Sequence, residues 1–210
     1  MKDKNRVCEI LFSCLIVLST DVLVSFIYKT HATIFQFGYI YRLFLGAFVS
    51  IFPIYVAAKN YKSIVARSMK PWSIGILIIT TLIPLFFSDV DFERKVYVWI
   101  HYVFLVALPE ELFFRVYLPE RLGEELLRKQ RFSDISLYII VSFLANTLWG
   151  LSHIIFPLIT GAYKLEPLWS YITFGIANGW IYTILFFLFR KNILPSVAVH
   201  AVMNICISTL

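Results

Sequence analysis

Charged residues are scarce in this 210-residue chain, at 15%, and apolar residues make up 60% of it. Soluble domains average about 25% charged and 45–50% apolar residues. A soluble globule of this length cannot bury so much apolar surface, so the composition excludes a water-soluble enzyme. The same figures exclude a disordered chain. The class that is left is a protein with several membrane spans.

Cysteine, glycine and proline are also sparse. The three cysteines, Cys8, Cys14 and Cys206, fall in apolar stretches and lack the spacing of a disulfide framework or a zinc site. The eight glycines and eight prolines are scattered rather than gathered in linkers, so we expect a single domain over residues 1–210. The net charge of +6 does not indicate a nucleic-acid partner, because its distribution is that of a membrane topology signal.

Seven apolar segments approach the length of about 20 residues that a membrane span needs. They predict an all-α fold: a polytopic membrane bundle of about seven transmembrane helices, within a range of six to eight. The first run follows a basic start but is too long for a signal peptide and lacks a small-x-small cleavage site, so we interpret it as a retained span. The segments are 7–28, 34–58, 72–88, 96–118, 134–156, 168–189 and 193–210.

Lysine and arginine fall mostly on one side of this predicted membrane. Of the 19, 13 lie in the loops of one side and 4 in those of the other, while Arg42 and Arg115 lie inside spans. The positive-inside rule then predicts a cytoplasmic N-terminus and a C-terminus on the far side. Residues 119–133 mix charges with leucines at helical spacing, which predicts a surface amphipathic helix or an extension of the fourth span.

Two charged residues in the first two spans, Asp21 and Arg42, have similar predicted depths. Asp21 is about 22 Å from the cytoplasmic end of its span, and Arg42 is about 12 Å from the far end of its own, in a core about 30 Å thick. A charge inside a span costs about 2.5–3.5 kcal/mol on insertion scales. We therefore predict a structural ion pair between them rather than a functional role.

The fourth span contains the most informative motif, Glu110-Glu111-x-x-x-Arg115, directly after Pro109. Glu111 and Arg115 are four residues apart, so they share a helix face and can pair. Glu110 is rotated by about 100° from Glu111 and cannot easily join that pair. It is therefore the candidate general base, whereas the alternative is one packing network of all three residues. Pro109 removes a backbone donor and is expected to bend the helix.

The fifth and seventh spans add two histidines and an amide. Trp149 lies one turn before His153, and His200 and Asn204 are four apart on one face. A lone membrane histidine more often makes an interhelical hydrogen bond, but this set can run a hydrolysis: a base and a histidine activate water, and a second histidine and an amide stabilise an oxyanion. His31 lies in a short far-side loop and needs no functional explanation.

The predicted depths of these residues disagree. Counted from the cytoplasmic ends of the spans, Glu110 and His200 are both about 12 Å deep, whereas His153 is near 28 Å. Shared chemistry requires the three side chains to converge. A later start or a strong tilt of the fifth span, or a longer fourth span, would reconcile the depths, and the sequence does not decide between them.

Together these motifs resemble the CPBP family, the CAAX-protease and bacteriocin-processing membrane proteins, also called the Abi family. The resemblance covers roughly residues 95–210, whereas residues 1–90 carry no motif of the family. It rests on Glu110-Glu111-x-x-x-Arg115, Trp149-x-x-x-His153 and His200-x-x-x-Asn204. The second motif usually begins with Phe, where this chain has Trp149.

The resemblance implies a glutamic-type intramembrane endopeptidase whose catalytic core is formed by the fourth to seventh spans, without a cofactor. Glu110 would activate water with help from His153, His200 and Asn204 would stabilise the oxyanion, and the Glu111–Arg115 pair would hold the helix. The implied partner is a membrane-associated peptide or protein, which in eukaryotic members is a prenylated CAAX tail. The compact chain looks more like bacterial members, which implies a bacterial cytoplasmic membrane and leaves the substrate open.

Three other hypotheses about the function stay open. A zinc-dependent peptidase would take His153, His200 and a glutamate as ligands, although no His-Glu-x-x-His pair is present. A non-catalytic regulator or scaffold of the same family would show degenerate motifs, and here they are intact. A small transporter would show repeat symmetry or paired broken helices, and neither is visible. The sequence does not give the oligomeric state.

Overall fold

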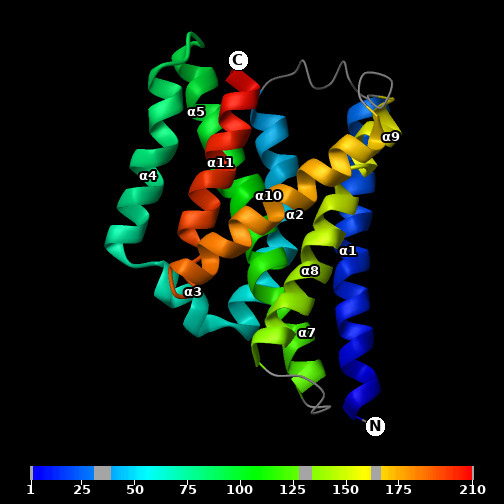
Figure 1. Ribbon diagram of the computed structural model, residues 1–210. Helices are drawn as coiled ribbons and strands as arrows, with labels where there is room; N and C mark the ends of the chain where they lie inside the picture. Colours follow the sequence, from blue (N-terminus) through cyan, green and yellow to red (C-terminus); the bar gives the residue numbers. More distant parts are fainter. Residues whose placement is uncertain (1, 31–38, 128–133, 162–166, 210) are drawn as a thin grey trace. The chain divides into compact units, whose positions relative to one another are not determined.

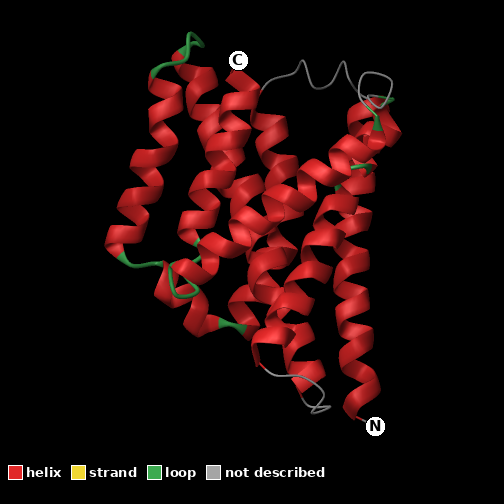
Figure 2. Cartoon of the chain, in the orientation of Figure 1, coloured by secondary structure: helices red, strands yellow, loops and turns green. Residues whose placement is uncertain are grey.

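The computed structural model describes residues 2–30, 39–127, 134–161 and 167–209. Within these residues every element is a helix and there is no strand (Figure 2). The all-α class predicted from the sequence is therefore confirmed. Among the described residues, five helices are long and apolar enough to cross a membrane, and they are Val7–Ile27, Leu43–Asn60, Phe92–Leu126, Ser136–Thr160 and Leu168–Leu188.

Two further segments bear on the number of spans. The helices α3 (Lys62–Ser68) and α4 (Pro71–Phe86) meet at an angle of 63° and form a sixth span if they are counted together. The last helix, α11 (Leu194–Thr209), is apolar but has only 16 residues. A polytopic bundle is thus confirmed, whereas the number seven stays a prediction.

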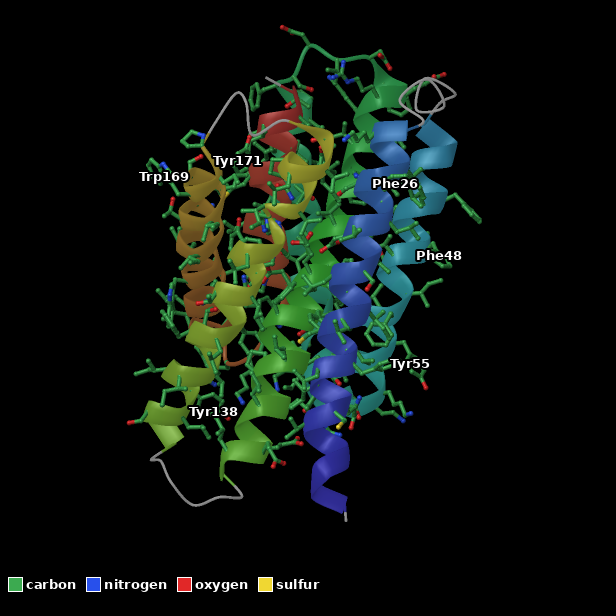
Figure 3. All side chains as sticks on the ribbon, turned by 90° about the vertical axis from the view of Figure 1, so that its right-hand side faces the viewer. Phe26, Phe48, Tyr55, Tyr138, Trp169 and Tyr171 are labelled. Atoms are coloured by element: carbon green, nitrogen blue, oxygen red, sulfur yellow. The ribbon has the colours of Figure 1, made fainter. Side chains whose placement is uncertain are left out.

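Large apolar side chains cover the outside of the candidate spans. Phe48 and Tyr55 point away from α2 (Tyr39–Asn60) in Figure 3, and both are more than half exposed. Phe86 on α4 is 81% exposed. Soluble monomers rarely leave apolar patches of this kind in water. The hydrocarbon of a bilayer is the solvent that suits this surface.

The chain forms two compact units, and each draws on both halves of the sequence. Unit 1 comprises Met1–Ile34 and Tyr117–Trp180, and unit 2 comprises Phe35–Val116 and Ile181–Leu210. Two helical stretches pass from one unit into the other: the long stretch that begins at Phe92, and α10 (Leu168–Leu188).

In unit 1, α1 (Lys2–Thr30) packs against α9 (Ile155–Thr160) and α7 (Leu118–Leu127), as Figure 1 shows. Two polar contacts hold α1 to the region around α7. The hydroxyl groups of Ser13 and Tyr117 are 2.9 Å apart, and the Arg121 guanidinium donates to Glu9 at 2.6 Å. These contacts place α1 beside the end of the long helix that begins at Phe92.

Also in unit 1, α8 (Asp134–Ser152) crosses α10 at a pair of glycines. A Cβ atom at Gly150 would lie 2.7 Å from Ile176 Cγ1, and one at Gly175 would lie 2.8 Å from Gly150 Cα. Only glycine permits so close an approach of two helix backbones, as at other membrane helix crossings. This crossing positions the part of α8 that carries Trp149.

In unit 2, buried polar groups join the α3–α4 bend to the turn between α10 and α11. The Ser68 hydroxyl accepts the backbone N–H of Ile193 at 2.9 Å, and the Asn192 amide donates to the Ser73 hydroxyl at 2.6 Å. Arg190 and Lys191 close this turn in the left-handed region, with φ values of 57° and 60°. The start of α11 is therefore tied to the rest of the unit.

The fourth predicted span is one continuous helical stretch from Phe92 to Leu127. Its segments are α5 (Phe92–Ile100), η2 (His101–Ala107), α6 (Leu108–Glu111), η3 (Leu112–Tyr117) and α7, where η2 and η3 are π-helical. Of the two interpretations of residues 119–133, the extension of the span therefore holds as far as Leu127, and residues 128–133 lie outside the described residues. π-Helical turns are frequent at functional sites, and here they flank the two adjacent glutamates on α6.

Pro109, where the sequence predicts a bend, lies between the two π-helical segments, and α2 packs against the helix there. Proline has no N–H to donate to the preceding turn. The Ser50 hydroxyl instead donates to the carbonyl of Leu105, four residues before Pro109, at 3.0 Å, and also to Gly46 O at 2.7 Å. A Cβ atom at Gly46 would lie 3.2 Å from Leu105 Cβ, so α2 approaches η2 closely at this point.

Two sequence predictions fall outside what the structure describes. The side chain of Arg42 is not among the described side chains, so the ion pair between Asp21 and Arg42 stays a prediction. His31 lies in the segment 31–38, which is also outside the described residues.

Candidate active site

Glu111 is the centre of a buried polar cluster in unit 2. Its side chain has no solvent exposure, and its two oxygens face different partners. Oε2 lies 3.4 Å from Arg115 Nε, and Oε1 lies 3.0 Å from His200 Nδ1. The Glu111–Arg115 approach has the i, i+4 spacing expected from the sequence, whereas the contact with His200 on α11 joins two distant parts of the chain.

Glu110 differs from Glu111 in access to solvent. Its side chain is 34% exposed, and its Oε2 lies 3.9 Å from His200 Nε2. The two neighbouring glutamates therefore approach opposite nitrogens of one imidazole ring. Because Glu111 is enclosed between a guanidinium and an imidazole, Glu110 is the carboxylate of this pair that a water molecule can reach.

The proton positions on His200 follow from these contacts. A carboxylate only accepts hydrogen bonds, so Nδ1 carries a proton and donates it to Glu111. The other nitrogen, Nε2, faces Glu110. This arrangement, in which a buried carboxylate fixes the tautomer and direction of a histidine, is the one that orients histidines in many hydrolytic sites.

Asn204 lies one turn after His200 on α11 and is half-buried. Residues four apart on a helix share a face. The amide of Asn204 and the imidazole of His200 are therefore presented by the same side of α11.

Trp149 and His153 lie in unit 1, at the end of α8. Trp149 is 2% exposed, and its ring meets the imidazole of His153 edge to face with the centroids 4.5 Å apart. His153 follows the last residue of α8 in a two-residue break before α9. Its Nδ1 donates to the Trp149 carbonyl at 2.8 Å, so a neutral ring leaves Nε2 as an acceptor.

The length of the fourth span changes one sequence expectation. The helix continues to Leu127, so Glu110 is 17 residues, or about 25 Å, from its end rather than about 12 Å. His153 is about 28 Å from the start of α8 by the same count. The two counts refer to helices of different units, so a common depth of His153 and Glu110 stays a prediction.

Sequence reasoning missed two features of the cluster. The contact of Glu111 with His200 has no local signal, because the residues are 89 positions apart. The second feature is Tyr182 on α10, whose ring stacks on His200 with the centroids 4.9 Å apart. An isolated tyrosine in an apolar helix gives no pattern from which this contact could be predicted.

No group of three or more His, Cys, Asp or Glu side chains that could hold a metal ion occurs in the part of the chain that the structure describes. The polar cluster of unit 2 instead combines carboxylates with a guanidinium, an imidazole and a phenol.

Comparison with known proteins gives the family of the chain. Residues 92–206 match the family described as type II CAAX prenyl endopeptidase Rce1-like. No curated protein and no solved structure matches the chain. The matched region is more than half of the chain and contains all three motifs, from Glu110 to Asn204, so the resemblance to the CPBP proteins is confirmed. The chain belongs to the Rce1-like family of type II CAAX prenyl endopeptidases and is an integral membrane protease.

Proposed function

We propose that this protease hydrolyses a peptide bond with a water molecule that Glu110 activates. The observation that carries the proposal is the difference between two adjacent carboxylates. Glu110 is one-third exposed and directed at His200 Nε2, whereas Glu111 is fully buried between Arg115 and His200. A general base must reach the proton it removes, and only Glu110 of the two has that access.

The reaction is a hydrolysis by general base catalysis. Glu110 takes a proton from the water while the water oxygen attacks the carbonyl carbon of the scissile bond. This attack forms a tetrahedral intermediate with an oxyanion. The C–N bond then breaks, and the proton held by Glu110 passes to the leaving amine. The products are a free carboxylate and an amine, and the glutamate returns to its ionised form.

His200 and Asn204 would stabilise the oxyanion through donors on one face of α11. Since Nδ1 of His200 already donates to Glu111, His200 can donate to the oxyanion only through a protonated Nε2. The two carboxylates beside the ring provide negative charge next to such an imidazolium. His153, whose Nε2 is an acceptor in the neutral ring, suits the role of an assistant in water activation.

We propose that the substrate is a membrane-associated peptide or protein. Because of the family description, a peptide with a prenylated C-terminal CAAX sequence is the first substrate to test. The proposed activation of the water uses no metal ion or other cofactor. From the loop charges we propose a cytoplasmic N-terminus. A bacterial cytoplasmic membrane suits the compact chain.

The replacement Glu110→Gln tests the mechanism. It removes the base while it keeps the size of the side chain, so cleavage should fall by about 10²–10⁴-fold. The probe is a fluorogenic farnesylated peptide that ends in a CAAX sequence, added to the purified protein in liposomes. The matched control is Glu93→Gln, which changes an exposed glutamate on the same long helical stretch and should leave the rate unchanged.

Two results would count against the proposal. Cleavage at the wild-type rate by the Glu110→Gln variant would show that another group activates the water. Loss of wild-type cleavage after treatment with 1,10-phenanthroline, and its recovery on addition of zinc, would show that a metal ion takes part.

A further inference from the structure

Tyr182 is a buried aromatic residue of α10 that belongs to none of the three sequence motifs. Its side chain is 2% exposed, and it lies in unit 2 together with α6 and α11. It contacts two members of the polar cluster at once. The phenol ring stacks on the imidazole of His200 with an interplanar angle of 13°, and Arg115 Cζ lies 5.9 Å from the ring centroid.

Tyr182 makes two hydrogen bonds to α11, the helix that carries His200, one through its backbone and one through its ring hydroxyl. The backbone carbonyl of Tyr182 accepts the Ser196 hydroxyl at 2.9 Å, and the phenol hydroxyl donates to Met203 Sδ at 3.2 Å. Ser196 lies four residues before His200 and Met203 lies three residues after it. The two helices are therefore held in register on both sides of the histidine.

A hydrogen bond from Nδ1 to Glu111 does not by itself fix the plane of the imidazole. The ring can still turn about the axis of that bond, and such a rotation would move Nε2 away from Glu110. A flat aromatic surface parallel to the imidazole opposes the rotation, because tilting the ring loses the stacked contact. The face of the phenol also favours positive charge on the neighbouring guanidinium and on a protonated imidazole.

We propose that Tyr182 is a positioning residue that sets the plane of His200 and so directs Nε2 toward Glu110 and the developing oxyanion. This inference rests on the proposed function for the role of His200, but the stacking itself can be tested without any substrate. The ring, rather than the hydroxyl group, is the part of the side chain that acts.

The kinetic test compares Tyr182→Leu with Tyr182→Phe on the farnesylated CAAX peptide. A small misplacement of a catalytic group can lower the rate by about 100-fold, so Tyr182→Leu should lower kcat by about 10- to 100-fold with little change in KM. Tyr182→Phe keeps the stacked ring and should rescue kcat to within about threefold of the wild type. The matched control is Phe187→Leu, which removes a 37% exposed aromatic side chain from the same helix and should change neither constant.

A second readout follows the histidine itself. With histidine labelled by ¹⁵N and ¹³C, the ring signals of His200 are assigned by their loss in His200→Gln. The signals should shift in Tyr182→Leu, because the ring current of the phenol is lost, and stay in place in Tyr182→Phe and Phe187→Leu. These spectra need no substrate, so they test whether Tyr182 positions His200 even if the enzyme does not cleave the farnesylated peptide.

Unchanged His200 signals in Tyr182→Leu would overturn the proposal, as would a wild-type kcat in that variant. An equal loss of kcat in Tyr182→Phe and Tyr182→Leu would also overturn it, because the hydroxyl group would then be the part that matters. Activity that survives Glu110→Gln would instead contradict the proposed function, whatever the Tyr182 variants show.

Discussion

A carboxylate without solvent exposure inside a membrane protein has to be neutralised by its neighbours. Glu111 meets this requirement with one partner on its own helix, Arg115, and one on another helix, His200. Arg115 is itself buried, and its guanidinium lies against the face of Tyr182. Each charge in the cluster depends on the others, so the removal of one leaves an uncompensated charge in a medium that cannot solvate it.

The variant Arg115→Ala should therefore destabilise the protein strongly, by about 3 kcal/mol, because Glu111 loses its cation. The measurement is the free energy of unfolding in mixed micelles of increasing SDS fraction. The matched control is Arg121→Ala, which breaks the more exposed ion pairs with Glu9 and Glu124 and should cost at most about 1 kcal/mol. Equal losses in the two variants would contradict the structural role of the buried pair. The double variant Glu111→Gln/Arg115→Met should recover part of the stability, because no unpaired charge is left.

At the residue scale, the spacing of residues along one helix predicts contacts within that helix but not contacts between helices. The i, i+4 rule was sufficient for Glu111 and Arg115, because both residues lie on one helix turn. It could not indicate that Glu111 also holds His200, or that Tyr182 lies flat against the histidine. Those contacts depend on how α10 and α11 pack, and helix packing leaves no short-range mark in an apolar sequence.

At the scale of elements, the segment that presents Glu110 is irregular and is supported from outside. Two π-helical segments flank α6, and Pro109 interrupts the backbone hydrogen bonds between them. Ser50 on α2 donates to the Leu105 carbonyl, the one that an α-helical residue 109 would bond through its N–H. The support comes from a span in which sequence reasoning found no motif, so an N-terminal span helps to hold the segment that carries Glu110.

The variant Ser50→Ala should lower stability by about 1 kcal/mol, because the Leu105 carbonyl loses a donor where water is scarce. The unfolding free energy in SDS mixed micelles measures the change. The matched control is Ser208→Ala, since the Ser208 hydroxyl donates only within its own helix, to Ile205 O. In a Pro109→Ala background, residue 109 regains an N–H, so the cost of Ser50→Ala should shrink. The same cost in both backgrounds would refute the link between Ser50 and Pro109.

Element boundaries followed from hydropathy where charges mark the ends of helices. The predicted segment 168–189 coincides closely with α10, and 72–88 with α4. The helix of the fourth predicted span continues beyond residue 118, because α7 runs on through Glu120, Glu124 and Glu125. Depth counts for α11 were also unreliable. His200 lies about 9 Å from the start of α11, yet its Nε2 lies 3.9 Å from Glu110 Oε2, so the end of a helix does not mark a common depth.

At the scale of the whole molecule, the cytoplasmic N-terminus stays a prediction, and the charged residues of unit 2 show where it can be tested. One end of the unit carries cations without any acidic residue, and the Arg67 guanidinium joins two of its turns by donating to Arg190 O at 3.0 Å. The cations of this end are Lys59, Lys62, Arg67, Lys70, Arg190 and Lys191. The turn after α4 instead carries Asp89 and Asp91. Cations at one end of a bundle are retained on the cytoplasmic side during insertion.

Labelling of single cysteines at the two ends of α4 tests this orientation and shows whether α4 crosses the bilayer. Cys8, Cys14 and Cys206 are replaced first, and Lys70→Cys and Asp89→Cys are then made separately, both at exposed positions. In intact cells, a membrane-impermeant maleimide should label the Asp89→Cys variant and leave the Lys70→Cys variant unlabelled, whereas permeabilised cells should show both. The opposite pattern would place the cationic end outside, against the positive-inside rule. Labelling of both variants in intact cells would mean that α3 and α4 enter and leave on one side, and the bent pair would then be a re-entrant segment rather than a span.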